Sequence, residues 1–141
     1  MTDLENAVNI LRDRDYTCVL CKGQQLYTSD RRGVAPLLFW LDAGVSLQGF
    51  SAADRVVGKA TAFLYVILGV HSVFAGVMSE PAVAVLTRAG IQVEYGTLVQ
   101  GIQNRTKDGP CPMEHATRNI EDAEEALEAI RSTLEKLRVS S

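Results

Sequence analysis

The sequence has little of what marks several common protein classes. Cysteine and histidine are scarce, with three and two residues among 141. Basic residues number 14 against 17 acidic ones, and this net charge of −3 excludes the strongly basic surface typical of nucleic-acid-binding proteins. The longest nearly apolar run, residues 60–70, is shorter than the roughly 20 residues that a membrane-spanning helix needs. We therefore expect a protein that neither binds nucleic acid nor spans a membrane.

The chain is long enough to fold without a covalent or metal cross-link. It fits one domain, residues 1–141, and 47% of its residues are hydrophobic, which suffices for a core of its own. The first 15 residues carry acids where a signal peptide has a basic start and an apolar stretch. This predicts a cytoplasmic protein whose cysteines are reduced thiols.

The spacing of apolar residues predicts alternating helices and strands. We expect helices at residues 3–14, 30–44, 58–69 and 79–90, a hairpin at 16–29, and strands at 70–78 and 91–99. The fourth helix has the clearest limits, since Ser79 is a suitable cap, Pro81 lies in the first turn and Gly90 follows the end. The strand–helix–strand–helix–strand order indicates an α/β fold with a mixed, mostly parallel sheet and helices on both faces.

A long C-terminal helix is predicted at about residues 117–138. Its apolar residues recur every three or four positions and form one narrow stripe: Ile120, Ala123, Leu127, Ile130, Leu134 and Leu137. Two interpretations follow. The stripe either docks on its own domain or packs against a second copy of the chain, which would make the protein a homo-oligomer.

The cysteines do not form a metal site of recognised spacing. Cys18 and Cys21 lie in a predicted strand, where side chains three residues apart point to opposite faces. Cys111 precedes Pro112, and if a helix begins there Cys111 lies at its N-terminus, where the helix dipole favours the thiolate. Cys111 is then either half of a nucleophile pair with His115 or an ordinary capping or packed residue.

Lys59 is a cation just inside a predicted helix start, where the dipole already supplies partial positive charge. It is either a surface lysine whose stem covers apolar neighbours or, with free backbone N–H groups, part of an anion site.

Four stretches together resemble an uncharacterised prokaryotic family, domain of unknown function 1893. They are "DRVVGKATAFL" at 54–64, residues 79–99, "NR" at 104–105 and "CPME" at 111–114, and the resemblance runs over about residues 5–120. That family is similar in fold to cytidine deaminases. The resemblance therefore implies a three-layer α/β/α sandwich around a mixed sheet.

The same resemblance implies that the deaminase zinc site is missing. In the deaminase pattern, His-Ala-Glu corresponds to residues 59–61, here Lys-Ala-Thr, and the two cysteines of Pro-Cys-x-x-Cys correspond to Ala82 and Val85. Zinc-dependent deamination needs the metal to generate hydroxide and the glutamate to move its proton. We therefore expect no bound metal, no cofactor and no zinc-dependent deaminase activity.

These observations favour a protein that binds a small anionic ligand in a deaminase-like pocket without zinc. Two helix N-termini and one ammonium would make the pocket electropositive. The predicted lining is Lys59, Ser79, Glu80, Asn104, Arg105 and Cys111. One alternative is an enzyme with Cys111 as nucleophile or Lys59 as a covalent or general-base group. The other is a non-catalytic scaffold or oligomer subunit.

Overall fold

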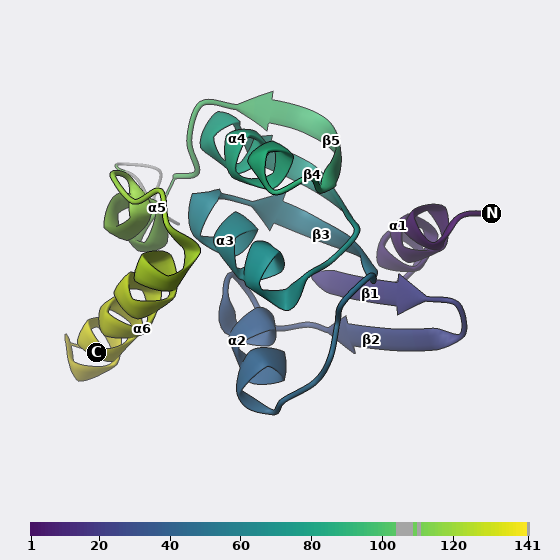
Figure 1. Ribbon diagram of the computed structural model, residues 1–141, viewed down its shortest axis with the longest axis horizontal. Helices are drawn as coiled ribbons and strands as arrows, with labels where there is room; N and C mark the ends of the chain where they lie inside the picture. Colours follow the sequence, from purple (N-terminus) through teal and green to yellow (C-terminus); the bar gives the residue numbers. More distant parts are fainter. Residues whose placement is uncertain (104–108, 110, 141) are drawn as a thin grey trace.

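A five-stranded mixed sheet lies at the centre of the protein (Figure 1). The computed structural model describes residues 1–103, 109 and 111–140. The strands are β1 (Cys18–Lys22), β2 (Gln25–Ser29), β3 (Ser51–Val57), β4 (Ser72–Ser79) and β5 (Gln92–Val99), in the order β2-β1-β3-β4-β5. β1 runs antiparallel to β2 and to β3, whereas β3, β4 and β5 are parallel. The predicted mixed α/β sheet is confirmed, but it is not mostly parallel, because the hairpin adds two antiparallel pairings to the two parallel ones.

Helices cover both faces of this sheet. They are α1 (Asp3–Asp13), α2 (Ala35–Asp42), α3 (Lys59–Leu68), α4 (Glu80–Arg88), α5 (Pro112–Thr117) and α6 (Ala123–Ser140). Successive side chains of β1 point to opposite faces of the sheet and so belong to two hydrophobic cores. Cys18 and Leu20 pack with α2 and α3, whereas Val19 and Cys21 pack with α1. The prediction that Cys18 and Cys21 face opposite ways is therefore confirmed.

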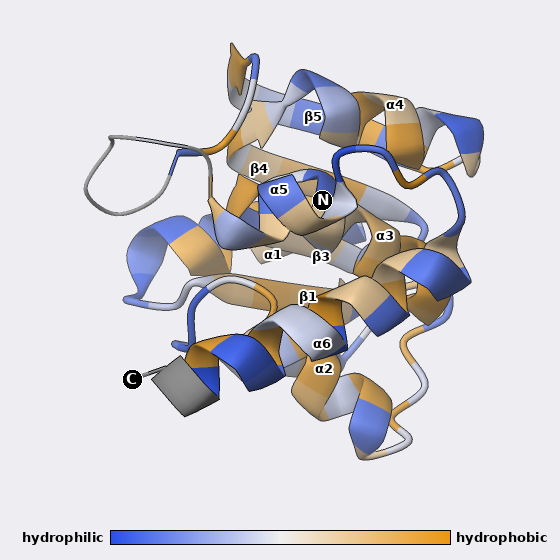
Figure 2. Cartoon of the chain, turned by 90° about the vertical axis from the view of Figure 1, so that its left-hand side faces the viewer, coloured by the Kyte–Doolittle hydropathy of each residue, from blue (hydrophilic) through white to orange (hydrophobic). Residues whose placement is uncertain are grey.

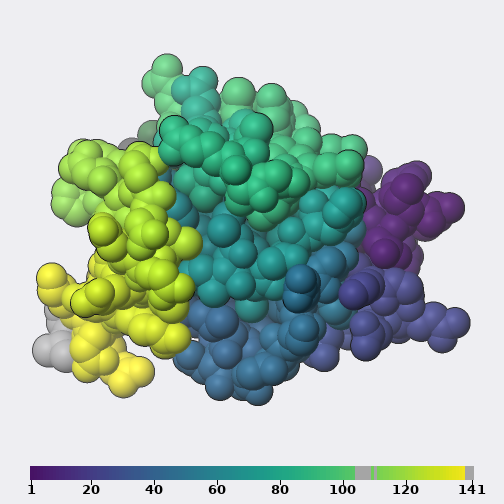
Figure 3. Space-filling view, in the orientation of Figure 1, coloured from purple at the N-terminus to yellow at the C-terminus, as the bar shows by residue number. Residues whose placement is uncertain are grey.

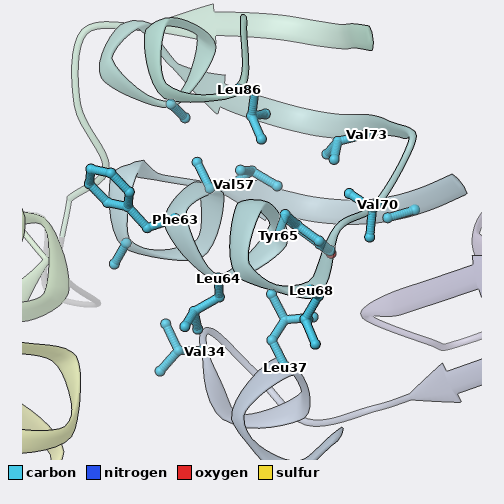
Figure 4. Packing of buried hydrophobic residues seen from close by; sticks show 14 of the residues in the cluster. Val34, Leu37, Val57, Phe63, Leu64, Tyr65, Leu68, Val70, Val73 and Leu86 are labelled. Carbon is cyan, nitrogen blue, oxygen red and sulfur yellow. The ribbon is translucent and has the colours of Figure 1, made fainter. Parts of the chain in front are cut away.

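α3 forms the centre of the larger core (Figure 4). Its side chains are apolar on almost every side, and Tyr65 and Leu64 are fully buried between neighbouring helices and the sheet. The helix ends at Gly69, whose φ of 74° favours glycine. No helix in the described part of the chain is both long and apolar enough to cross a membrane.

The C-terminal region differs from the prediction of one helix at 117–138. It contains two helices, α5 and α6, joined by residues 118–122. The break occurs because the Asp122 carboxylate accepts a hydrogen bond from Glu125 N at 3.0 Å, so α6 begins after Asp122 and Ile120 precedes it.

α6 docks on its own domain, beside α3 and α5 (Figure 3). Ala126 and Ile130 are fully buried, whereas Leu137 near the end is 44% exposed. Hydrophilic residues alternate with hydrophobic ones along α6, as expected for a helix with one buried side (Figure 2). Packing of this helix against a second copy of the chain stays a prediction.

Candidate functional site

A pocket of about 510 Å³ lies where β3 ends and α3 begins, a volume typical of small-molecule sites. Four parts of the chain form most of its wall: the end of β3, the start of α3, the connection from β2 to α2, and the segment that leads into α5. The lining residues are Thr17, Arg32, Gly33, Val34, Asp54, Arg55, Val56, Gly58, Ala60, Thr61, Ile102, Cys111, Met113 and Glu114. The wall is mainly apolar, with a few charged or polar groups among the lining residues.

Asp54 is the most deeply buried acid of this pocket, with 7% of its surface exposed. Tyr65 Oη donates a hydrogen bond of 2.7 Å to its Oδ2, and Val56 N donates to Oδ1 at 3.4 Å. Burial raises the pKa of Asp54 to about 7, although the hydrogen bond from Tyr65 opposes this rise. The carboxyl group can therefore take up and release a proton near neutral pH.

A short polar chain continues from Asp54 into the core. Cys18 Sγ lies 3.2 Å from Tyr65 Oη, and both residues are almost completely buried. Burial raises the pKa of the Cys18 thiol and of the Tyr65 hydroxyl well above their usual values, so both groups stay neutral at physiological pH. β1 and β3 bring this group together, because Cys18 pairs with Asp54 across the two strands.

Glu114 caps the N-terminus of α3. Its Oε1 accepts a hydrogen bond from Lys59 N, the first amide of the helix. Burial raises the pKa of Glu114, and the hydrogen bond from Lys59 N together with the charges of Lys59 and Arg118 opposes this. A Cβ atom on Gly58 would lie 2.0 Å from Glu114 Oε1, so any larger residue there would push this carboxylate away from the amide. The helix dipole of α3 thus acts on the protein's own carboxylate.

Lys59 points away from the pocket. Its Nζ donates to the Arg118 carbonyl at 3.0 Å, and lies 3.5 Å from Glu121 Oε1 and 5.9 Å from the centre of the Phe63 ring. With 6% of its surface exposed, Lys59 is not the surface lysine of one interpretation. It is not part of the pocket wall either, because its ammonium joins α3 to the α5–α6 connection.

Ser79 and Glu80 also lie outside the pocket. Ser79 is fully buried and caps α4, since its Oγ accepts a hydrogen bond from Ala82 N at 3.2 Å. Glu80 is exposed in the first turn of that helix. Of the starts of α3 and α4, the pocket borders that of α3 alone, so the predicted cavity between these two helix N-termini is not the cavity that the structure forms.

Cys111 is the predicted site residue that does line the pocket. It is the N-cap of α5, as predicted, and is half-buried. Within the described residues, the hydrogen bond that joins it to His115 is between backbone atoms, His115 N to Cys111 O at 3.0 Å. Asn104 and Arg105, the remaining predicted site residues, lie outside the described residues.

Sequence reasoning missed Asp54, the acid on which the pocket chemistry centres. A signal existed, because "SAAD" places an acid directly after small residues in a segment that precedes a buried helix. The small residues of β3 gave that segment weak strand character, although Ala52 and Ala53 are fully buried between β1 and β4. In the described part of the chain, no three histidine, cysteine or acidic side chains cluster as metal ligands would.

The chain is similar to one protein family over most of its length. The family model for domain of unknown function 1893 matches residues 6–134. A comparison with curated proteins gives no match. Among solved structures, the crystal structure of a DUF1893 family protein from Thermotoga maritima superposes with a TM-score of 0.85 at 22% identity, covering 94% of this chain and 90% of that one. This protein therefore belongs to the DUF1893 family.

Proposed function

We propose that this protein binds a small organic molecule in the pocket between β3, the start of α3 and α5. The observation that carries the proposal is the pocket itself, about 510 Å³ with a mainly apolar wall and the buried carboxyl of Asp54. A few polar groups within an apolar wall are typical of small-molecule sites, because the wall supplies affinity and the polar groups fix orientation.

We further propose that the fold is a zinc-free form of the cytidine deaminase fold, in a cytoplasmic protein. Helices on both faces of a mixed sheet support this. The positions that correspond to the deaminase zinc ligands also lie on the expected helices. The first turn of α3 contains Lys59, Ala60 and Thr61, and α4 contains Ala82 and Val85.

An anionic ligand is the second candidate, supported by Arg32 on the pocket wall. Lys59 no longer supports that class, because its ammonium is bound to the Arg118 carbonyl and to Glu121. The same contacts hold the Lys59 ammonium outside the pocket, which disfavours it as a covalent or general-base group for a ligand bound there. An enzyme with Cys111 as nucleophile remains the catalytic alternative, since Cys111 shares the pocket.

The test is a fragment screen by thermal shift and ligand-observed NMR on three forms of the full chain. Val56→Trp fills the pocket from an exposed position of β3, and Leu98→Trp is the control on β5, outside the pocket. The two side chains are 43% and 41% exposed, so both positions tolerate a larger residue. Wild type and Leu98→Trp should bind the same fragments, and Val56→Trp should lose them. Equal binding by all three, or binding by none, would contradict the proposal.

A further inference from the structure

Asp54 accepts the hydrogen bond of buried Tyr65, but an ionised acid at this position has no partner of opposite charge among the described residues. Burying a carboxylate is costly unless a cation accompanies it. Within the described residues, no lysine or arginine forms an ion pair with Asp54. Its neighbour Arg55 points to the other face of the sheet, where the guanidinium donates hydrogen bonds to the carbonyls of Leu11, Arg14 and Tyr16.

Two hydrogen bonds to Asp54 have regular donor–acceptor geometry, whereas the Arg55 amide and the Cys18 thiol act on its carboxylate more weakly. Tyr65 Oη binds Oδ2, and Val56 N binds Oδ1 only weakly, at 3.4 Å. A carboxylate has about four acceptor positions. Since Asp54 lines the pocket, its unused acceptor positions are available to a ligand there.

On the basis of the proposed function, we infer that Asp54 binds a ligand with an amidine-type head, a planar cation that presents two parallel N–H groups. Such a head matches a carboxylate through two parallel charge-assisted hydrogen bonds. The ligand then supplies the cation that the protein does not. The apolar wall, which includes Val34, Ile102 and Met113, suits a flat or aromatic body attached to that head.

The pairing depends on pH in a defined direction. Below about pH 7 the Asp54 carboxyl is mostly protonated and cannot form an ion pair with a cationic ligand. Above about pH 7 it is mostly ionised and can form one. The other titratable or charged groups that face Asp54 or share its pocket are Cys18, Tyr65, Arg32, Arg55, Cys111 and Glu114. Cys18 and Tyr65 stay neutral across this range because burial raises their pKa values. Glu114 also has a raised pKa, so Glu114→Gln serves as the control for its contribution.

The experiment compares three probes of nearly equal shape: benzamidine, a cation; benzamide, neutral; and benzoate, an anion. Calorimetry or NMR titration measures their binding to the full chain at pH 6 and pH 8. Benzamidine should bind best, and about tenfold more tightly at pH 8 than at pH 6, since the ionised fraction of Asp54 rises by about that factor. Asp54→Asn should abolish this pH dependence, whereas Glu114→Gln should retain most of it.

Tyr65→Phe provides a second variant in case Asp54→Asn fails to fold. It keeps the carboxyl and removes the hydroxyl that stabilises its charge, so the pH at which benzamidine binding increases should rise. An unchanged pH profile in Tyr65→Phe would overturn the inference. Binding of benzamide or benzoate with an affinity equal to that of benzamidine would also overturn it. If Val56→Trp then blocks the binding of all three probes, the proposed function still stands. If Val56→Trp changes the binding of none of the probes, the proposed function itself fails.

Discussion

The N-termini of α3 and α4 are capped in different ways. Both helices follow a parallel strand and both leave backbone amides that need acceptors. α4 uses a local cap, Ser79, whose oxygen binds the amide of Ala82 three residues later. α3 has no side-chain cap of its own at Gly58 and uses the carboxylate of Glu114, 55 residues further along the chain. The difference shows that the start of α3 depends on the C-terminal segment, whereas the start of α4, at the same edge of the sheet, does not.

This difference also explains where the pocket lies. Glu114 and Met113 belong to α5, and they form one wall of the pocket while Glu114 caps α3. Ser79, the cap of α4, is fully buried and does not line this pocket. An anion site at either helix start would have to displace a cap that the protein already supplies, whereas the buried carboxyl of Asp54 caps no helix and lies on the pocket wall.

The largest effect is expected from Gly58→Ala, which removes the space that Glu114 occupies. The new Cβ would lie 2.0 Å from Glu114 Oε1 and force the carboxylate away from the α3 amide. Since the carboxylate is the end of a flexible side chain and can swing aside, the cost is mainly the lost charge-assisted hydrogen bond, and the free energy of unfolding should fall by about 2 to 3 kcal/mol. Urea unfolding measures it. Gly101→Ala, where a Cβ meets open space, is the matched control, and an equal cost for both would refute the close packing at Gly58.

Glu114→Ala should cost somewhat less, about 2 kcal/mol, because the amide of Lys59 loses its acceptor without a steric clash. Glu114→Gln keeps an acceptor oxygen at that amide and should cost under about 1 kcal/mol. Urea unfolding measures the free energy of unfolding of both variants. If alanine and glutamine at this position cost the same, the carboxylate is not the cap of α3.

The local cap of α4 should contribute less than the distant cap of α3. Ser79→Ala is expected to lower the free energy of unfolding by about 1 kcal/mol, and Ser79→Gly by only a few tenths. Thermal unfolding of both variants beside Glu114→Ala gives the ranking. A cost for Ser79→Ala above that of Glu114→Ala would reverse the comparison between the two helices.

The smallest effect is expected for Lys59→Met. The substitution removes the hydrogen bond to the Arg118 carbonyl but also removes the cost of burying an ammonium beside the exposed Glu121. The lost hydrogen bond and the avoided burial cost nearly cancel, so the free energy of unfolding should fall by about 0.5 kcal/mol or less. Chemical denaturation measures this difference. A loss above about 2 kcal/mol would mean that the ammonium is essential for docking of the α5–α6 connection.

The fold was largely predictable because its signals are local. Ser79 and Pro81 mark the start of α4, and the opposite directions of Cys18 and Cys21 follow from the period of a strand. The break between α5 and α6 was not predicted, although Asp122 is a suitable cap, because the apolar stripe continues across it from Ile120 to Ala123.

The site was less predictable because its groups meet only in the folded chain. Cys111 was predicted as a site residue and lines the pocket. The positions of Lys59 and Glu114 depend on the docking of α5 and of the connection that follows it, which no spacing in the sequence specifies. The isolation of Asp54 depends on Arg55 turning to the opposite face, toward the end of α1.

The central claim is that Asp54, and not a helix N-terminus, is the group with which this pocket acts on a ligand. Its most direct test is a pH titration of the Asp54 carboxyl carbon by 13C NMR, with Asp54→Asn to assign the signal. The account predicts a midpoint near pH 7, because burial raises the pKa of Asp54 to about 7, and a shift to lower pH when benzamidine is added. A midpoint near the ordinary value of 3.8, unmoved by benzamidine, would contradict it.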